Sequence, residues 1–175
     1  MTAEQWYKEF WKRSLKAKKL NQKCSTSKYT KQMDAFLRGM ADDLGFGVPE
    51  PENPVFGGKR IDQLWRKGNF EIAIEHENDH SGISNEIRKL CKNKSNLKVL
   101  ITYVEDKDFV FRAHEIAKRV ENEITQLGPY REEFLLVVGD YGEYDWCADW
   151  AAFHSVTTTS MELLRGQHAR QGKKT

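Results

Sequence analysis

Three acidic residues near the middle of the chain have the types and the spacing of a metal site. Glu75 and Glu77 end a run of alternating and β-branched residues over 70–77 that predicts a strand, and Asp62 lies in the segment before it. Because residues i and i+2 of a strand share a face, Glu75 and Glu77 point the same way, roughly 7 Å apart. Asp62, on the preceding strand of a hairpin, can face them across the ladder, so three carboxylates are expected to converge at one end of a sheet.

Such a cluster favours a hard divalent cation. Close carboxylates raise one another's pKa, and a bound cation removes that cost. Mg²⁺ takes one or two carboxylates, keeps several waters and accepts phosphate oxygens, and Mn²⁺ can substitute for it. The chemistry that we expect at Asp62, Glu75 and Glu77 is therefore hydrolysis of phosphodiester bonds by metal-activated water. The alternative is a solvated hairpin edge on which each carboxylate pairs with a nearby lysine.

Five basic residues flank these acids, two shortly before Asp62 and three on the helix predicted after the hairpin. They are Lys59, Arg60, Arg88, Lys89 and Lys92. Lys89 is the cation that we expect at the catalytic site, because a helix that follows the glutamate strand packs back over the sheet. The other four are candidates for binding the phosphates of a nucleic acid.

The hydrophobic pattern around the site predicts alternating helices and strands. Helices are expected where apolar residues recur at helical spacing, and strands where apolar runs are β-branched. The predicted order is a helix after Thr2, a helix over 29–44, a hairpin over 59–77, a helix over 84–94, a strand over 97–104, a helix over 113–124, and strands over 134–138 and 153–159. This order predicts an α/β fold with a mixed central sheet and flanking helices.

Length and composition predict one domain, with a basic N-terminal helical arm (1–27), a core (28–140), edge elements (141–165) and a flexible tail (166–175). Residues 1–38 hold ten Lys and Arg against three Asp and Glu, although the whole chain has a net charge of +2. This asymmetry fits a polyanionic partner. Aromatic residues of the arm, such as Trp6 and Phe10, either pack in the core or stack on nucleobases, and the helical spacing favours the core.

The overall composition indicates a globular protein without a membrane span. With 39% hydrophobic and 31% charged residues, the chain is typical of globular proteins. No apolar run approaches the roughly 20 residues of a membrane span, so no membrane association is expected. The three cysteines, Cys24, Cys91 and Cys147, are widely spaced, which predicts reduced thiols and a cytoplasmic location.

The order of these motifs resembles the PD-(D/E)XK, or restriction-endonuclease-like, nuclease superfamily over roughly residues 28–140. Ile61-Asp62 stands where the family has Pro-Asp, and Glu75-His76-Glu77 stands where it has (D/E)-x-K, followed by a helix and a buried strand. The resemblance implies a restriction-endonuclease-like fold and the activity of a Mg²⁺-dependent endodeoxyribonuclease. DNA is the expected partner, RNA stays an alternative, and the analogy also allows a homodimer.

Two features of the family pattern are altered or open here. Glu77 replaces the family lysine; some members use such a glutamate as a base or ligand, and others move the lysine onto the neighbouring helix, which suits Lys89. Many members also draw an acid from the preceding helix, for which Asp34, Asp42 and Asp43 are candidates. Because of the replaced lysine, the alternative function is a catalytically inactive nuclease fold that serves as a binding or regulatory subunit.

A second motif, His76-Glu77-x-x-His80, matches the zinc-protease signature. That signature works on a helix, where histidines at i and i+4 share a face. On the strand predicted here, the two histidines would lie roughly 13 Å apart, too far to share one zinc. A zinc peptidase is therefore the least favoured of the three functions.

Overall fold

The computed structural model describes residues 1–17, 26–47, 50–51, 54–55, 59–78, 81–104, 108–128, 132–141, 146–155 and 161–164. At positions 26, 50–51, 54–55, 59–60, 141 and 146–149 it describes the main chain alone. The predicted tail at 166–175 and His80 lie outside these ranges.

Four helices and nine strands make up the described part of the chain. The helices are α1 (Ala3–Ser14), α2 (Thr26–Asp43), α3 (Ile83–Lys92) and α4 (Phe109–Leu127). The strands are β1 (Glu50–Pro51), β2 (Pro54–Val55), β3 (Lys59–Arg60), β4 (Gln63–Lys67), β5 (Phe70–Glu77), β6 (Leu97–Val104), β7 (Glu133–Tyr141), β8 (Trp146–Ser155) and β9 (Glu162–Leu163). No helix among the described residues is both long and apolar enough to cross a membrane.

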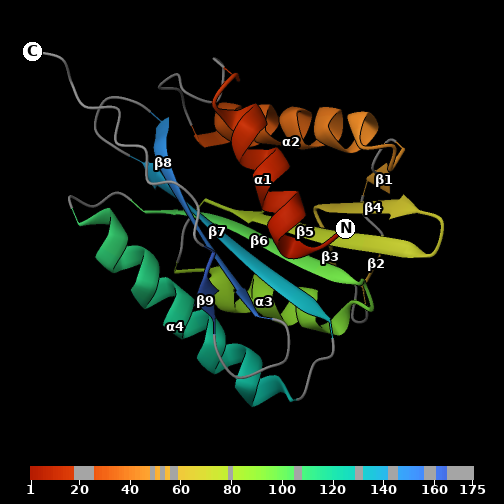
Figure 1. Cartoon of the computed structure of the whole chain (residues 1–175). Coiled ribbons are helices and arrows are strands. Elements are labelled where there is room, and N and C mark those ends of the chain that lie inside the picture. Colours follow the sequence, from red (N-terminus) through yellow and green to blue (C-terminus); the bar gives the residue numbers. More distant parts are fainter. Residues whose placement is uncertain are drawn as a thin grey trace, which may run out of the picture.

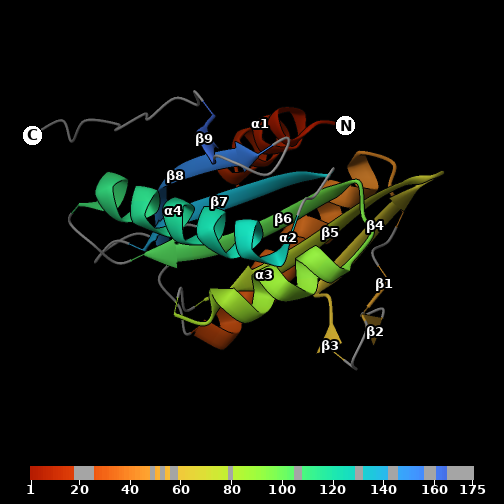
Figure 2. The ribbon, with the colours of Figure 1, turned by 90° about the horizontal axis from the view of Figure 1, so that it is seen from below.

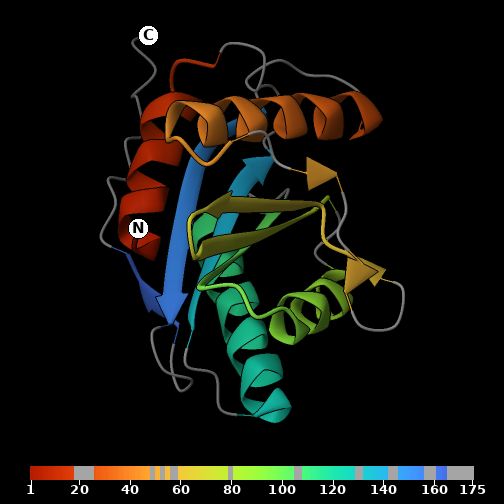
Figure 3. The same cartoon turned by 90° about the vertical axis from the view of Figure 1, so that its right-hand side faces the viewer.

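A mixed seven-stranded sheet in the order β1-β4-β5-β6-β7-β8-β9 forms the centre of the fold. Strands β5, β6 and β7 are parallel, whereas β4 pairs antiparallel with β5 and β8 with β7. Helices α1 and α2 cover one face of the sheet, and α3 and α4 cover the other (Figures 1, 2 and 3). The predicted α/β class with a mixed sheet and flanking helices is confirmed.

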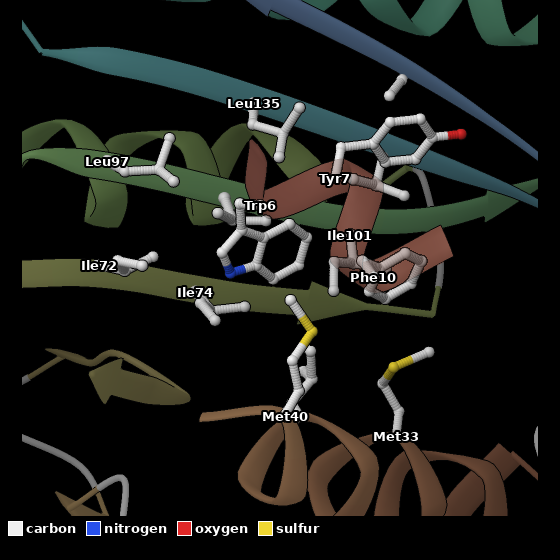
Figure 4. Close-up of a cluster of buried hydrophobic side chains, with 14 of the residues drawn as sticks. Trp6, Tyr7, Phe10, Met33, Met40, Ile72, Ile74, Leu97, Ile101 and Leu135 are labelled. Carbon is white, nitrogen blue, oxygen red and sulfur yellow. The ribbon is translucent and has the colours of Figure 1, made fainter. Parts of the chain in front are cut away.

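Two hydrophobic clusters, one on each face of the sheet, hold these layers together. The first joins α1 and α2 to residues on one face of the sheet, such as Ile72 and Ile74 of β5 (Figure 4). The second joins α3 and α4 to the opposite face, including Ala73. Every residue of β6 is buried, as expected of a parallel strand covered on both sides.

The aromatic residues of α1 belong to the first cluster. Phe10 is fully buried, stacks on Trp6 with ring centroids 5.3 Å apart, and meets the Trp150 ring edge-on at 4.8 Å. Thr2 and Gln5 form the capping box that starts this helix. The aromatic spacing therefore reflects packing against the sheet, and these rings are not available to nucleobases.

The β4–β5 hairpin sets the register of the acidic residues. The turn between its strands contains Gly68 with a φ of 58°, a conformation that glycine adopts at little cost. Gln63 lies opposite Ile74, so Asp62, one residue earlier, is brought level with Glu75. The predicted hairpin is present, but its first strand is shorter than predicted: β4 begins at Gln63, so Asp62 precedes the strand, and β3 pairs with β2 instead of β5. The last predicted strand is shifted: β8 spans Trp146–Ser155, and residues 156–160 lie outside the described ranges.

We predict that Phe10→Ala lowers the free energy of unfolding by about 3–5 kcal/mol, because it leaves a cavity between α1, α2 and β8. Leu15→Ala, at a position that is 57% exposed one residue past the same helix, should change it by less than about 0.5 kcal/mol. Urea unfolding of both variants measures the difference. Equal small effects would show that α1 does not stabilise the sheet.

Candidate active site

Asp62 is held beside β5 by a main-chain hydrogen bond. Its Oδ2 accepts from the His76 N–H at 2.9 Å, which fixes the carboxylate at the start of β4. The residue keeps one side open to solvent. Burial of its other side raises the pKa of the Asp62 carboxyl, although the His76 N–H and the Lys89 ammonium oppose that rise.

Glu75 and Lys89 form the centre of the site. Glu75 is only 1% exposed, and its Oε2 accepts from the Lys89 Nζ at 2.8 Å. The same ammonium is also paired with Glu86, on the same helix. The second oxygen of Glu75, Oε1, is buried and has no hydrogen-bond partner. A buried carboxylate oxygen left in this way carries a desolvation cost that a cation would remove.

The elements that carry these groups explain why they meet. Helix α3 follows β5 and buries Ile83, Ile87 and Leu90 against the sheet, which turns the neighbouring helix positions toward the strand. Glu86 and Lys89 are three residues apart and so lie on the same side of α3. Side chains from the hairpin and from the following helix therefore converge near the carboxyl end of β5.

The charges of the site do not balance. Burial raises the pKa of Glu75 far above its ordinary value, and the neighbouring Glu86 and Asp62 raise it further. Burial disfavours the charged form of Lys89, but its hydrogen bonds to the two glutamates outweigh this and leave the Lys89 pKa raised. Three carboxylates thus share one ammonium, an arrangement that favours uptake of a proton or a cation.

The other predicted residues of the hairpin and α3 lie around this centre. Glu77 lies two residues beyond Glu75 on the same face of β5 and is half-buried. Arg88 is directed to α4, where its Nη2 lies 3.6 Å from Glu123 Oε2, and Lys92 is exposed in the last turn of α3. Lys59 and Arg60 form β3, and their side chains lie outside the described part. The structure therefore brings together Asp62, Glu75 and Lys89 but turns Arg88 elsewhere.

The candidate acids of α2 lie on the opposite side of the sheet. Asp34 Oδ1 accepts from the Gln63 Nε2 at 2.6 Å, and its Oδ2 accepts from Arg38. Asp43 is paired with Arg13 of α1, and Asp42 is exposed near the end of α2. Because α2 and α3 cover opposite faces, the preceding helix does not supply the extra acid of this site.

Glu86 is the member of the site that sequence reasoning missed. It supplies the third carboxylate from the helix that follows the strand, and its side chain is 15% exposed. The signal available was the Glu86-x-x-Lys89 spacing, which puts an acid beside the predicted catalytic cation.

The zinc-protease motif does not adopt the structure that it needs. His76 and Glu77 lie on β5, so their side chains point to opposite faces. The His76 ring lies on the α2 side, with its Nε2 2.7 Å from the Tyr103 hydroxyl. Burial lowers the pKa of His76 to about 4, which keeps the ring neutral. The strand predicted for this motif is confirmed.

No group of three or more His, Cys, Asp and Glu side chains forms a ready metal site among the residues that the structure describes. In this arrangement the Lys89 ammonium pairs with both Glu75 and Glu86. A comparison with models of known protein families finds no match. A comparison with curated protein sequences also finds none.

The neutral, largely buried His76 leads to a prediction about stability in acid. Its pKa is about 4 in the fold and 6.5 in the unfolded chain, so protons bind the unfolded state preferentially as the pH falls below about 6.5. Between pH 7 and 4.5, the wild type should lose about 1–2 kcal/mol more unfolding free energy than His76→Gln, a value discounted for partial exposure of the ring. Urea unfolding at both pH values measures this, and parallel pH curves for the two proteins would contradict it.

Proposed function

We propose that the chain is a Mg²⁺-dependent endodeoxyribonuclease with a restriction-endonuclease-like fold, similar to the PD-(D/E)XK nucleases. The observation that carries the proposal is the 2.8 Å contact between Lys89 and the buried Glu75, with Asp62 level with Glu75 just before the neighbouring strand. An aspartate, a glutamate and a lysine from consecutive elements thus meet at one point. Two carboxylates can hold a metal ion, and a metal ion and an ammonium can both stabilise negative charge on a phosphate.

Asp62 and Glu75 are the residues that would hold the cation. The unpartnered Glu75 Oε1 and the solvent-open side of Asp62 fit a hard cation that keeps several waters. When bound, such a cation lowers the pKa of its water and neutralises negative charge on the phosphate. Glu77, at the strand end, would add a further ligand or orient the attacking water.

Lys89 takes the role of the lysine that Glu77 replaces. Its ammonium is held at Glu75 from α3 instead of from β5, so the positive charge reaches the site from the helix. At that place it can contact a phosphate oxygen and stabilise the charge that develops there. This assignment answers the feature that favoured an inactive fold, because a lysine is present at the acids.

The arrangement of elements supports the proposed fold and partner. An antiparallel hairpin, a helix and a parallel strand follow one another in β4, β5, α3 and β6. The excess of Lys and Arg in residues 1–38 fits a nucleic acid, and the exposed Lys92 lies on the same helix as Lys89. The proposed substrate is DNA, and RNA is the alternative that the assay below distinguishes.

Cleavage of plasmid and linear DNA in the presence of Mg²⁺ tests the assignment. We expect Asp62→Asn, Glu75→Gln and Lys89→Met each to lower the rate by about 10²-fold or more, because each removes a charge from the reacting centre. Lys118→Met, at an exposed lysine of α4, serves as the matched control and should cleave like the wild type. A labelled RNA of the same sequence shows which nucleic acid is preferred.

Two outcomes would contradict the assignment. Full cleavage by Asp62→Asn and Glu75→Gln would place the active site elsewhere. Retained DNA binding without cleavage by the wild type, at several Mg²⁺ and Mn²⁺ concentrations, would support the inactive binding or regulatory subunit instead.

Metal binding should also appear as stability, without any substrate. A ligand that binds only the folded state at about 100 times its Kd adds about 2.7 kcal/mol, so we expect Mg²⁺ to raise the Tm of the wild type by several degrees. Glu75→Gln should show little of this shift, because the buried carboxylate is gone. Thermal denaturation with and without Mg²⁺, with Ca²⁺ for comparison, makes the measurement, and equal shifts in both proteins would exclude Glu75 as a ligand.

A further inference from the structure

Lys89 is held by two carboxylates that come from different elements. Its Nζ contacts Glu75 Oε2 of β5 at 2.8 Å and is also paired with Glu86 of α3. The side chains of Lys89 and Glu86 are each 15% exposed, far less than those of typical surface ion pairs such as Arg112 and Glu115, which are 51% and 48% exposed. The Lys89–Glu86 ion pair is therefore largely buried at the edge of the site.

The two carboxylates have different tasks if Glu75 is a metal ligand. A lysine side chain has four rotatable bonds and loses considerable conformational freedom when it is held in one place. A bound cation and the Lys89 ammonium would share the Glu75 carboxylate, since both carry positive charge. Glu86 lies one helical turn before Lys89 and moves with it as part of α3, so its contact does not depend on Glu75.

We propose that Glu86 is a positioning residue that keeps the Lys89 ammonium at the active site when the Glu75 carboxylate is engaged elsewhere. The inference rests on the proposed function, in which Lys89 contacts the phosphate, and it adds a residue that acts through that lysine. Without Glu86, a Lys89 that loses Glu75 would be drawn toward solvent, where its charge is hydrated. With Glu86, the ammonium stays over the carboxyl end of β5.

The position of Lys89 can be followed directly by the rate at which an amine-acylating reagent modifies it. Peptide mass spectrometry after timed labelling reports this rate in the full-length protein, with no nucleic acid present. We expect Glu86→Ala to raise the labelling rate of Lys89 by about tenfold, because a largely buried ion pair that holds the ammonium is lost. Glu115→Ala, which removes the exposed pair with the same i, i+3 spacing on α4, is the control and should leave Lys89 unchanged.

Variants of Glu75 separate the two partners. Glu75→Gln alone should raise Lys89 labelling by less than about threefold, because Glu86 still holds the ammonium, whereas the double variant with Glu86→Ala should label fastest of all. Glu86→Gln, whose amide oxygen still accepts a hydrogen bond, should lie between the wild type and Glu86→Ala. Urea unfolding of each variant shows whether the fold is intact, and labelling is compared among folded variants.

The results distinguish this inference from the proposed function. Unchanged Lys89 labelling in folded Glu86→Ala would overturn the positioning role, whatever the protein cleaves. Loss of Mn²⁺ binding in Glu86→Gln with unchanged Lys89 labelling would also overturn it, since Glu86 would then be a ligand. If Glu86→Ala labels faster as expected but Mg²⁺ alters neither Tm nor labelling in any variant, the positioning contact stands and the metal-dependent nuclease fails.

Discussion

Burial of the Glu75 carboxylate is the constraint on which the site depends. The residue lies near the end of β5, a strand that pairs with β4 on one side and with β6 on the other. A carboxylate in such a place must be neutralised, and the fold supplies Lys89 for this purpose. Lys89 meets this requirement in part, whereas Asp62 and Glu86 add negative charge beside Glu75 and leave its buried Oε1 without a hydrogen-bond partner.

The layers of the fold deliver these partners from different directions. Strand β5 pairs antiparallel with β4 and parallel with β6, so the start of β4 and the ends of β5 and β6 meet at one rim. Asp62 comes to this rim from the hairpin and Lys89 from the helix that packs back over the sheet. The hydrophobic clusters on the two faces fix the layers and hence the spacing of the charges.

Sequence alone predicted the parts of the site that follow from chain order. Asp62, Glu75 and Lys89 were expected together because a hairpin and the helix that follows it are usually close in space, independently of the rest of the fold. Glu86 was missed because an acid three residues before a lysine is usually a solvated surface pair, and only the packing of α3 shows that this one is largely buried.

The remaining differences between prediction and structure also have physical causes. The acids of α2 could not be placed, since the side of the sheet that a helix covers depends on long-range packing and not on local pattern. The start of β8 was missed because Trp146–Ser155 has alanines and no β-branched residue, so its strand forms through pairing with β7. The catalytic roles proposed for Asp62, Glu75, Glu77 and Lys89 stay predictions.

His76 contacts both the α2 side of the sheet and the candidate active site, through different atoms. Its imidazole contacts the Tyr103 hydroxyl beneath α2, while its main-chain N–H donates to Asp62. The side chain at position 76 can therefore change without loss of the contact to Asp62, provided that the new residue has a main-chain N–H. Proline is the single standard amino acid without one, so it alone would disconnect the aspartate at this point of the strand.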